Sequence, residues 1–180
     1  MMGFATGFRV PPLSRKDIQD RAYTIRRMLG LGKTFYFDIT HFLEWVLPEI
    51  NEKFCLRIVG DDELGSDFAR AYPDKDLILA RESVYRNACN GMGRDRLVLA
   101  HEAGHVFLHR GIPPAYAKSG DGSLKAYEDS EWQATVFGAE LLASVYLIRN
   151  WTVKQVVERC GISLEAAKKQ LQHANKITPR

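Results

Sequence analysis

Cysteine is scarce in this sequence of 180 residues, in which Cys55, Cys89 and Cys160 are far apart. They form no CxxC pair, and an odd number of cysteines cannot pair completely. The pattern argues against a disulfide-stabilised secreted scaffold and against a cysteine-based zinc knuckle. We expect three free thiols in a reducing compartment, which indicates a cytoplasmic protein.

Long apolar runs are also missing from the sequence. No stretch approaches the roughly 20 apolar residues that a membrane-spanning helix requires. Residues 1–17 contain no continuous apolar segment of the kind found in secretory signal peptides. Internal repeats and low-complexity tracts are absent as well. The sequence therefore predicts a soluble protein that has no membrane partner.

A large excess of one charge is the third absence. The chain has 25 Lys and Arg against 22 Asp and Glu, for a net charge of +3. This mildly basic balance permits contact with nucleic acid without indicating it. The other proportions, 46% hydrophobic and 26% charged residues, are those of an ordinary globular domain.

Hydrophobic periodicity and capping signals predict helices at both ends of the chain, with strands between them. We expect helices over residues 14–29, 38–46, 95–109, 126–148, 152–159 and 163–174. We expect strands over residues 53–59, 76–80 and 82–86. This order predicts an α+β domain whose small sheet is mainly antiparallel. We divide the chain into a flexible arm (1–13), a main domain (14–150) and a C-terminal helical subdomain packed on it (151–180).

The segment HEAGH at residues 101–105 carries the clearest chemical signal. Residues four apart on a helix lie on the same side, so the imidazoles of His101 and His105 can reach one Zn²⁺. Glu102 lies about 60° around the helix from His105, which suits a general base better than a ligand. A metal would also satisfy polar groups whose unpaired burial in this apolar helix costs several kcal/mol.

A catalytic zinc needs a third protein ligand. His109 lies too far along the same helix to turn back to the metal, and we expect it to be a C-terminal residue favoured by the helix dipole. The helix predicted over residues 126–148 is the better source. Its acidic candidates are Glu128, Asp129, Glu131 and Glu140. Spacing favours Glu131 or Glu128, because Glu140 points to a different side.

Two longer segments are similar to those of a known family. RDRLVLAHEAGHVFLH at residues 94–109 resembles the ImmA/IrrE metallopeptidases, and EWQATVFGAELL at 131–142 is similar to their ExxAN-x-FAAELL pattern. The segments at 78–85 and 22–26 also fit, and the resemblance covers roughly residues 14–173.

The resemblance implies that His101, His105 and Glu131 are zinc ligands and that Glu102 is the catalytic glutamate. Manganese or iron would accept the same ligands. The resemblance also implies a metallopeptidase domain over residues 14–150. Within it we expect a zincin-like pair of helices, one with the HExxH motif and one with the third ligand.

Members of the family typically cleave a helix-turn-helix transcriptional repressor encoded nearby, which switches on stress, phage or mobile-element genes. The resemblance therefore implies an endopeptidase of narrow specificity. Thr135 stands where the family usually has Asn or Asp, so a protein that binds such a repressor without cutting it stays open. Ala143-Ser144 replaces the usual Met-Pro, and we expect the helix to run longer there.

Residues 152–174 have the pattern of two helices joined by a tight turn, which is also that of a DNA-binding helix-turn-helix. The basic residues on or near the second helix are few: Lys168, Lys169, Lys176 and Arg180. We therefore expect this pair to cap the core or dock the substrate, and we do not expect direct DNA binding. A DNA-binding regulator is the third function that the sequence leaves open.

Overall fold

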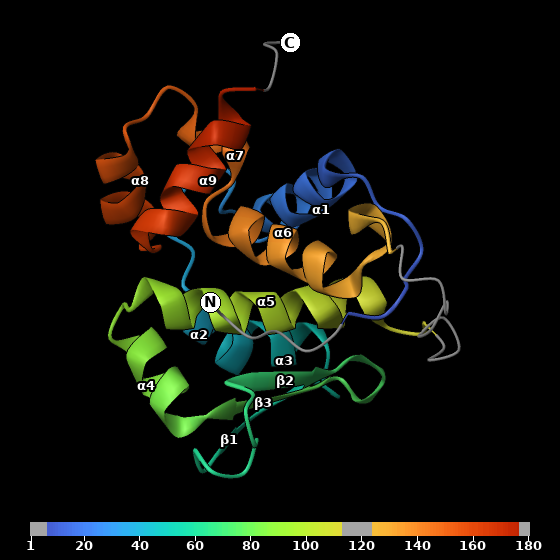
Figure 1. Ribbon diagram of the computed structural model, residues 1–180. Coiled ribbons are helices and arrows are strands. Elements are labelled where there is room, and N and C mark those ends of the chain that lie inside the picture. The colour runs from blue at the N-terminus through green and yellow to red at the C-terminus, as the bar shows by residue number, and fades with distance from the viewer. Residues whose placement is uncertain (1–6, 113–123, 177–180) are drawn as a thin grey trace.

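The computed structural model describes residues 7–112 and 124–176 of the chain. Helix α5 lies at the centre, between a small sheet on one side and the helices α1 and α6 on the other (Figure 1). The longer helices are α1 (Arg15–Met28), α4 (Glu82–Cys89), α5 (Gly93–His109), α6 (Ser130–Leu142), α8 (Val153–Cys160) and α9 (Leu164–Ala174). The arrangement is the expected mixture of α and β structure.

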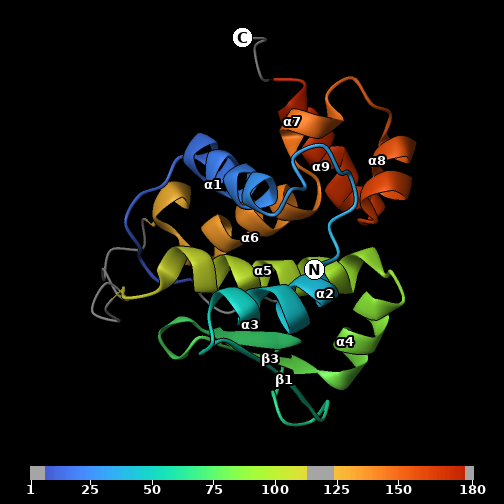
Figure 2. The same cartoon turned by 180° about the vertical axis from the view of Figure 1, so that it is seen from behind.

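Shorter elements complete the fold. They are α2 (Ile39–His41), the π-helix η1 (Phe42–Val46), α3 (Leu47–Ile50), the 3-10 turns η2 (Pro73–Lys75) and η4 (Ala126–Glu128), and α7 (Val145–Ile148). Seen from behind, α2 and α3 lie beside α5 on the side of the sheet (Figure 2). Among the described residues, no helix is both long enough and apolar enough to cross a membrane.

The sheet has three strands in the order β1-β3-β2: β1 (Cys55–Val59), β3 (Leu77–Arg81) and β2 (Ala69–Tyr72). β1 pairs with β3 in parallel, and β2 pairs with β3 antiparallel. The expectation of a mainly antiparallel sheet was therefore wrong, because the crossover from β1 to β3 places one parallel pair beside one antiparallel pair. Alternate residues of β3, Ile78 and Ala80, are buried in the core that the sheet shares with the helices.

The strand predicted over residues 82–86 is wrong, because this segment forms helix α4. Its buried residues Val84 and Ala88 are four apart, which is a helical spacing, and Glu82 stands in the first turn. Strand β2, by contrast, was missed. Its four residues are too few to show an alternating pattern.

Helices α5 and α6 approach each other closely at two glycines. A Cβ atom on Gly104 would lie 2.9 Å from the Cα atom of Ala134, and one on Gly138 would lie 2.8 Å from the backbone nitrogen of His101. Both distances are shorter than side chains allow, so only glycine fits. This close packing brings the N-terminal end of α6 over the HEAGH segment.

The helix predicted over residues 126–148 is divided into η4, α6 and α7. α6 ends at Leu142, and Ala143 leaves the helical conformation with φ −142°. The expectation of a longer helix was wrong, because the buried carboxylate of Glu140 accepts a hydrogen bond from the Val145 amide at 3.1 Å and stabilises the break.

Buried polar contacts join the C-terminal pair α8 and α9 to the rest of the protein. The Arg96 guanidinium donates to the carbonyls of Cys160 and Gly161, and Gln170 donates to the carbonyl of Ala143 at 2.8 Å. Gly161 allows the tight turn between the two helices, since its φ of 63° is left-handed. The division into arm, main domain and C-terminal subdomain stays a prediction.

Candidate metal centre

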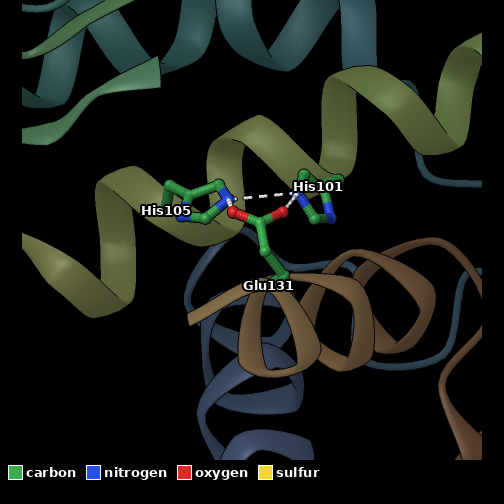
Figure 3. Close-up of side chains that lie close together, drawn as sticks. All are labelled: His101, His105 and Glu131. Carbon is green, nitrogen blue, oxygen red and sulfur yellow. Dashed lines mark hydrogen bonds and ion pairs between the residues drawn. The ribbon is translucent and has the colours of Figure 1, made fainter. Parts of the chain in front are cut away.

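Three side chains from two helices converge at the crossing of α5 and α6 (Figure 3). The Nε2 atoms of His101 and His105 are 3.0 Å apart, and Glu131 places one carboxylate oxygen 3.1 Å from His101 Nε2 and the other 3.4 Å from His105 Nε2. Tetrahedral ligands at zinc bond lengths are separated by about 3.3 Å. The three printed separations are close to this value, and one donor atom from each residue lies within 4.8 Å of the other two, so the cluster can hold one metal ion.

The start of α6 positions Glu131. Asp129 is the N-cap of this helix, and its carboxylate accepts a hydrogen bond from the Glu131 amide at 2.9 Å. Burial raises the pKa of Glu131, but hydrogen bonds to His101 and His105 outweigh burial and hold the pKa at about 2. The first turn of a helix also favours negative charge. Glu131 is therefore a carboxylate at neutral pH, which is the form that binds a metal.

The other acidic candidates for the third ligand lie outside the cluster of potential ligands. Asp129 is used as the helix cap, Glu128 belongs to the preceding turn η4, and Glu140 is bonded to Gln19 and Val145. Within residues 7–112 and 124–176, only the cluster of His101, His105 and Glu131 has a geometry suited to a metal ion. The structure thus brings together the three predicted ligands, whose role as ligands stays a prediction.

Glu102 faces strand β2. One of its carboxylate oxygens accepts a hydrogen bond from the Ala71 amide at 2.7 Å, and the residue is 8% exposed. Burial raises the pKa of the Glu102 carboxyl to about 7, although His105 and the Ala71 amide act in the opposite direction. A carboxyl group with a pKa near 7 can both accept and release a proton near neutral pH, as a general base that later acts as an acid must do.

Each imidazole has a partner for its second nitrogen. His101 Nδ1 lies 3.2 Å from Thr135 Oγ1, and His105 Nδ1 lies 3.0 Å from His109 Nδ1. Such contacts set the orientation and the tautomer of histidines that bind metals. Thr135 therefore lies where its hydroxyl can orient the His101 ring.

His109 is the last residue of α5, as predicted, but the expected stabilisation of its positive charge by the helix dipole was wrong. The residue is 2% exposed, and its Nε2 lies 3.2 Å from Gln133 Oε1. Burial, together with His105, lowers the pKa of His109 to about 4, so the ring is neutral at neutral pH. The four-residue spacing from His105, which repeats that of His101 and His105, was the signal that could have placed it on the same face. Gln133 was missed, and no sequence signal singled it out.

The family model of the IrrE N-terminal-like domain, Peptidase M78, matches residues 61–172. This segment is more than half of the chain and contains α5, α6 and the whole cluster. The chain belongs to this family. A search among curated proteins found no match.

Membership in the Peptidase M78 family confirms the resemblance seen in the sequence and supports a metallopeptidase. The cluster of two histidines and one glutamate supports a bound metal. The family match and the arrangement of the donor atoms therefore point to the same class of protein, a metal-dependent peptidase.

Proposed function

We propose that this protein is a zinc-dependent endopeptidase of narrow specificity that acts in the cytoplasm. Its substrate in this proposal is a helix-turn-helix transcriptional repressor, whose cleavage switches on stress, phage or mobile-element genes. The observation that carries the proposal is the triangle of His101, His105 and Glu131, with Glu102 on the same helix as the two histidines. The family match supports the peptidase class, and the sequence resemblance supports the substrate.

The donor set fits zinc. Two imidazole nitrogens and one carboxylate form a three-ligand set of the kind that catalytic zinc sites use, with a fourth position left for water or substrate. When bound, zinc polarises a carbonyl group and makes water more acidic. Manganese and iron also bind to such ligands, so zinc is the first metal to test.

The residues of the chain supply the proton transfers. Glu102, as a carboxylate, takes a proton from the attacking water and then gives it to the nitrogen of the leaving amine. The Ala71 amide holds one Glu102 oxygen at 2.7 Å, which fixes the direction of the carboxyl group. Thr135 and His109 contact the second nitrogens of the two histidines and hold their rings in place.

Metal content is the first test of the proposal. We expect about one zinc per chain in the purified wild-type protein, and loss of zinc from His105→Ala and Glu131→Ala. Zinc that remained in Glu131→Ala would contradict the assignment of Glu131 as third ligand. Wild-type protein that takes up no metal, even after reconstitution, would contradict the peptidase proposal.

Cleavage is the second test, with the helix-turn-helix repressor encoded beside the gene as the substrate. We expect zinc-loaded wild-type protein to cut it at a defined position, visible by mass spectrometry of the fragments. Binding without cutting would instead favour the non-cleaving regulator. Affinity for DNA that falls steeply with salt would favour the DNA-binding regulator.

A further inference from the structure

A chain of hydrogen bonds begins beyond the candidate metal centre, at Gln133 of α6. Its side-chain nitrogen donates to the carbonyl of Pro11 at 2.9 Å and to the carbonyl of Tyr127 at 2.8 Å. Carbonyl oxygens accept hydrogen bonds and cannot donate them, so the orientation of this buried amide is fixed. The amide oxygen of Gln133 must then be the atom that faces His109, 3.2 Å from its Nε2.

The direction of this first step determines the next ones. An amide oxygen only accepts, so His109 Nε2 carries the proton that is shared with Gln133. In a neutral imidazole the other nitrogen is then an acceptor. His109 Nδ1 lies 3.0 Å from His105 Nδ1, and the proton between these two nitrogens therefore belongs to His105.

The result at His105 is a defined tautomer. Its proton is on Nδ1, and its Nε2 has a free electron pair that faces His101 Nε2 at 3.0 Å and Glu131 at 3.4 Å. Only an unprotonated nitrogen can bind a metal. The opposite tautomer would place a hydrogen atom where the metal has to be.

We propose that Gln133 and His109 are positioning residues, which hold the His105 proton on Nδ1 and thereby set the affinity of the centre for its metal. The second clause rests on the metal site of the proposed function, and the first does not. The apparent affinity for a ligand is the intrinsic affinity multiplied by the fraction of protein that is in the binding-competent form. A mixture of His105 tautomers would therefore weaken metal binding without removing any ligand.

The hydrogen bonds that orient Gln133 involve the segment before α1, so this segment also affects the candidate metal centre. Pro11 belongs to this segment, which runs beside η4 through hydrogen bonds from Val10 to Glu128 and from Leu13 to Tyr127, both 2.9 Å long. The two carbonyls that orient Gln133 thus belong to two segments that are hydrogen-bonded to each other: Pro11 lies in the segment before α1, and Tyr127 lies in η4. The segment therefore helps to define where a proton lies at the metal centre.

The tautomer is tested first, in metal-free protein, by ¹⁵N-resolved NMR of the histidine rings. We expect His105 protonated on Nδ1 and His109 protonated on Nε2 in the wild type, and a mixture of His105 tautomers in Gln133→Met. A wild-type His105 protonated on Nε2 would overturn the proposal, whatever the protein binds. Because the wild-type spectrum needs no metal and no variant, it can overturn the first clause even when Gln133→Met does not fold.

Zinc affinity is tested next, by competition with a coloured chelator. We expect Gln133→Met and His109→Leu to bind zinc more weakly than the wild type, by about twofold where the two His105 tautomers become equally populated, and by about 10–100-fold where the orientation of the His105 ring is lost as well. His109→Gln should recover most of the affinity, because an amide offers one acceptor to His105 and one donor to Gln133.

A matched control separates positioning from general damage. Gln170 is also a buried glutamine, 2% exposed, that donates to a backbone carbonyl, but it lies on α9 and contacts Ala143. We expect Gln170→Met to lose stability and to keep the wild-type zinc affinity. Equal zinc affinities in Gln170→Met and Gln133→Met would overturn the second clause. A wild-type protein without any zinc affinity would contradict the proposed function and this clause together, while NMR of the wild type and Gln133→Met would still test the first clause.

Discussion

Two glutamates, one on each central helix, are buried to a similar degree and have similar pKa values in different surroundings. Glu102 on α5 is 8% exposed and Glu140 on α6 is fully buried. Burial raises the pKa of each carboxyl group to about 7. A raised pKa therefore reports burial and does not by itself distinguish a reactive group from a structural one.

The neighbours make the distinction. Among the described residues, Glu102 accepts its one hydrogen bond from Ala71 and lies next to the histidines of the candidate metal centre. Glu140 accepts hydrogen bonds from Gln19 of α1 and from the Val145 amide of α7, both at 3.1 Å. Glu140 thus joins three helices, whereas Glu102 keeps part of its bonding capacity for other groups. We expect the two residues to fail in different ways when they are changed.

The largest expected effect is that of Glu102→Gln on the rate at which the proposed repressor substrate is cleaved. A glutamine cannot accept and return the proton, so we expect the rate to fall by about 10²–10⁴-fold, the usual contribution of a general base. Zinc content should stay that of the wild type, because Glu102 is not among the metal ligands. The rate is measured by following the fragments over time with zinc-loaded protein. Glu140→Gln is the matched control, and an equal loss of rate in both variants would break the comparison.

The second effect is on the pH dependence of stability, through Glu140. Its pKa is about 7 in the folded protein against an ordinary 4.5, so the folded state holds this proton more tightly. The resulting stability is complete below pH 4.5 and is lost as the pH rises through 7. It amounts to about 3 kcal/mol. We expect Glu140→Gln to lack this loss, because glutamine is neutral at every pH.

Urea unfolding at pH 5 and pH 8 measures the effect. Wild-type and variant proteins share all other titrating groups, including Glu102, so the difference between their pH dependences isolates Glu140. Arg15, which lies near enough to favour the Glu140 charge, is present in both. Identical pH dependences in the two proteins would show that Glu140 titrates near its ordinary pKa despite its burial.

The third expected effect concerns the contact between α5, which carries Glu102, and α6, which carries Glu140. Gly138→Ala would press a methyl group against the backbone of Ala100 and His101, at 2.8 Å. We expect a loss of about 1–3 kcal/mol in the free energy of unfolding, as for other overpacked sites, and weaker zinc binding because α6 carries Glu131.

Gly93→Ala is the control for the helix contact. Gly93 is the first residue of α5, and its added methyl group would lie against the backbone of Ile162 and Ser163, 2.5 Å from the nearest atom. We expect a comparable loss of stability, measured by urea unfolding, with unchanged zinc affinity. Zinc binding that weakened equally in the two variants would mean that the centre responds to any loss of stability.

The sequence allowed the prediction of the centre better than of the sheet. The HEAGH segment lies on one helix, and the four-residue spacing of its histidines determines their common side without further information. Glu131 required the family resemblance, because spacing alone left Glu128 open. Its selection depends on the packing of α5 against α6, which Gly104 and Gly138 allow at distances that no sequence pattern states.

The features that sequence reasoning missed depend on contacts between distant segments. The end of α6 follows from a hydrogen bond between Glu140 and Val145, and the parallel pairing of β1 with β3 follows from the crossover. His109 and Gln133 belong to the centre because two helices cross and a third segment supplies the carbonyl of Pro11. Local patterns contain none of these distances, and this is why the convergence of His101, His105 and Glu131 was predicted while the surroundings of the three residues were not.

The smallest expected effect comes from a change beside His101 of the candidate metal centre that leaves the surroundings of Glu140 unaltered. Thr135→Val removes the hydroxyl that lies 3.2 Å from His101 Nδ1, while it keeps the shape of the side chain. We expect zinc binding to weaken by about tenfold, at the lower end of the range for orienting groups, because a valine cannot accept the His101 proton. Thr135→Asn, which restores the usual residue of the family, should bind zinc at least as well as the wild type, since an amide oxygen accepts the same hydrogen bond. Chelator competition measures both variants beside Glu140→Gln, which should bind zinc as the wild type does. Unchanged affinity in Thr135→Val would show that the proton of His101 is held by another group, and that Thr135 contributes packing alone.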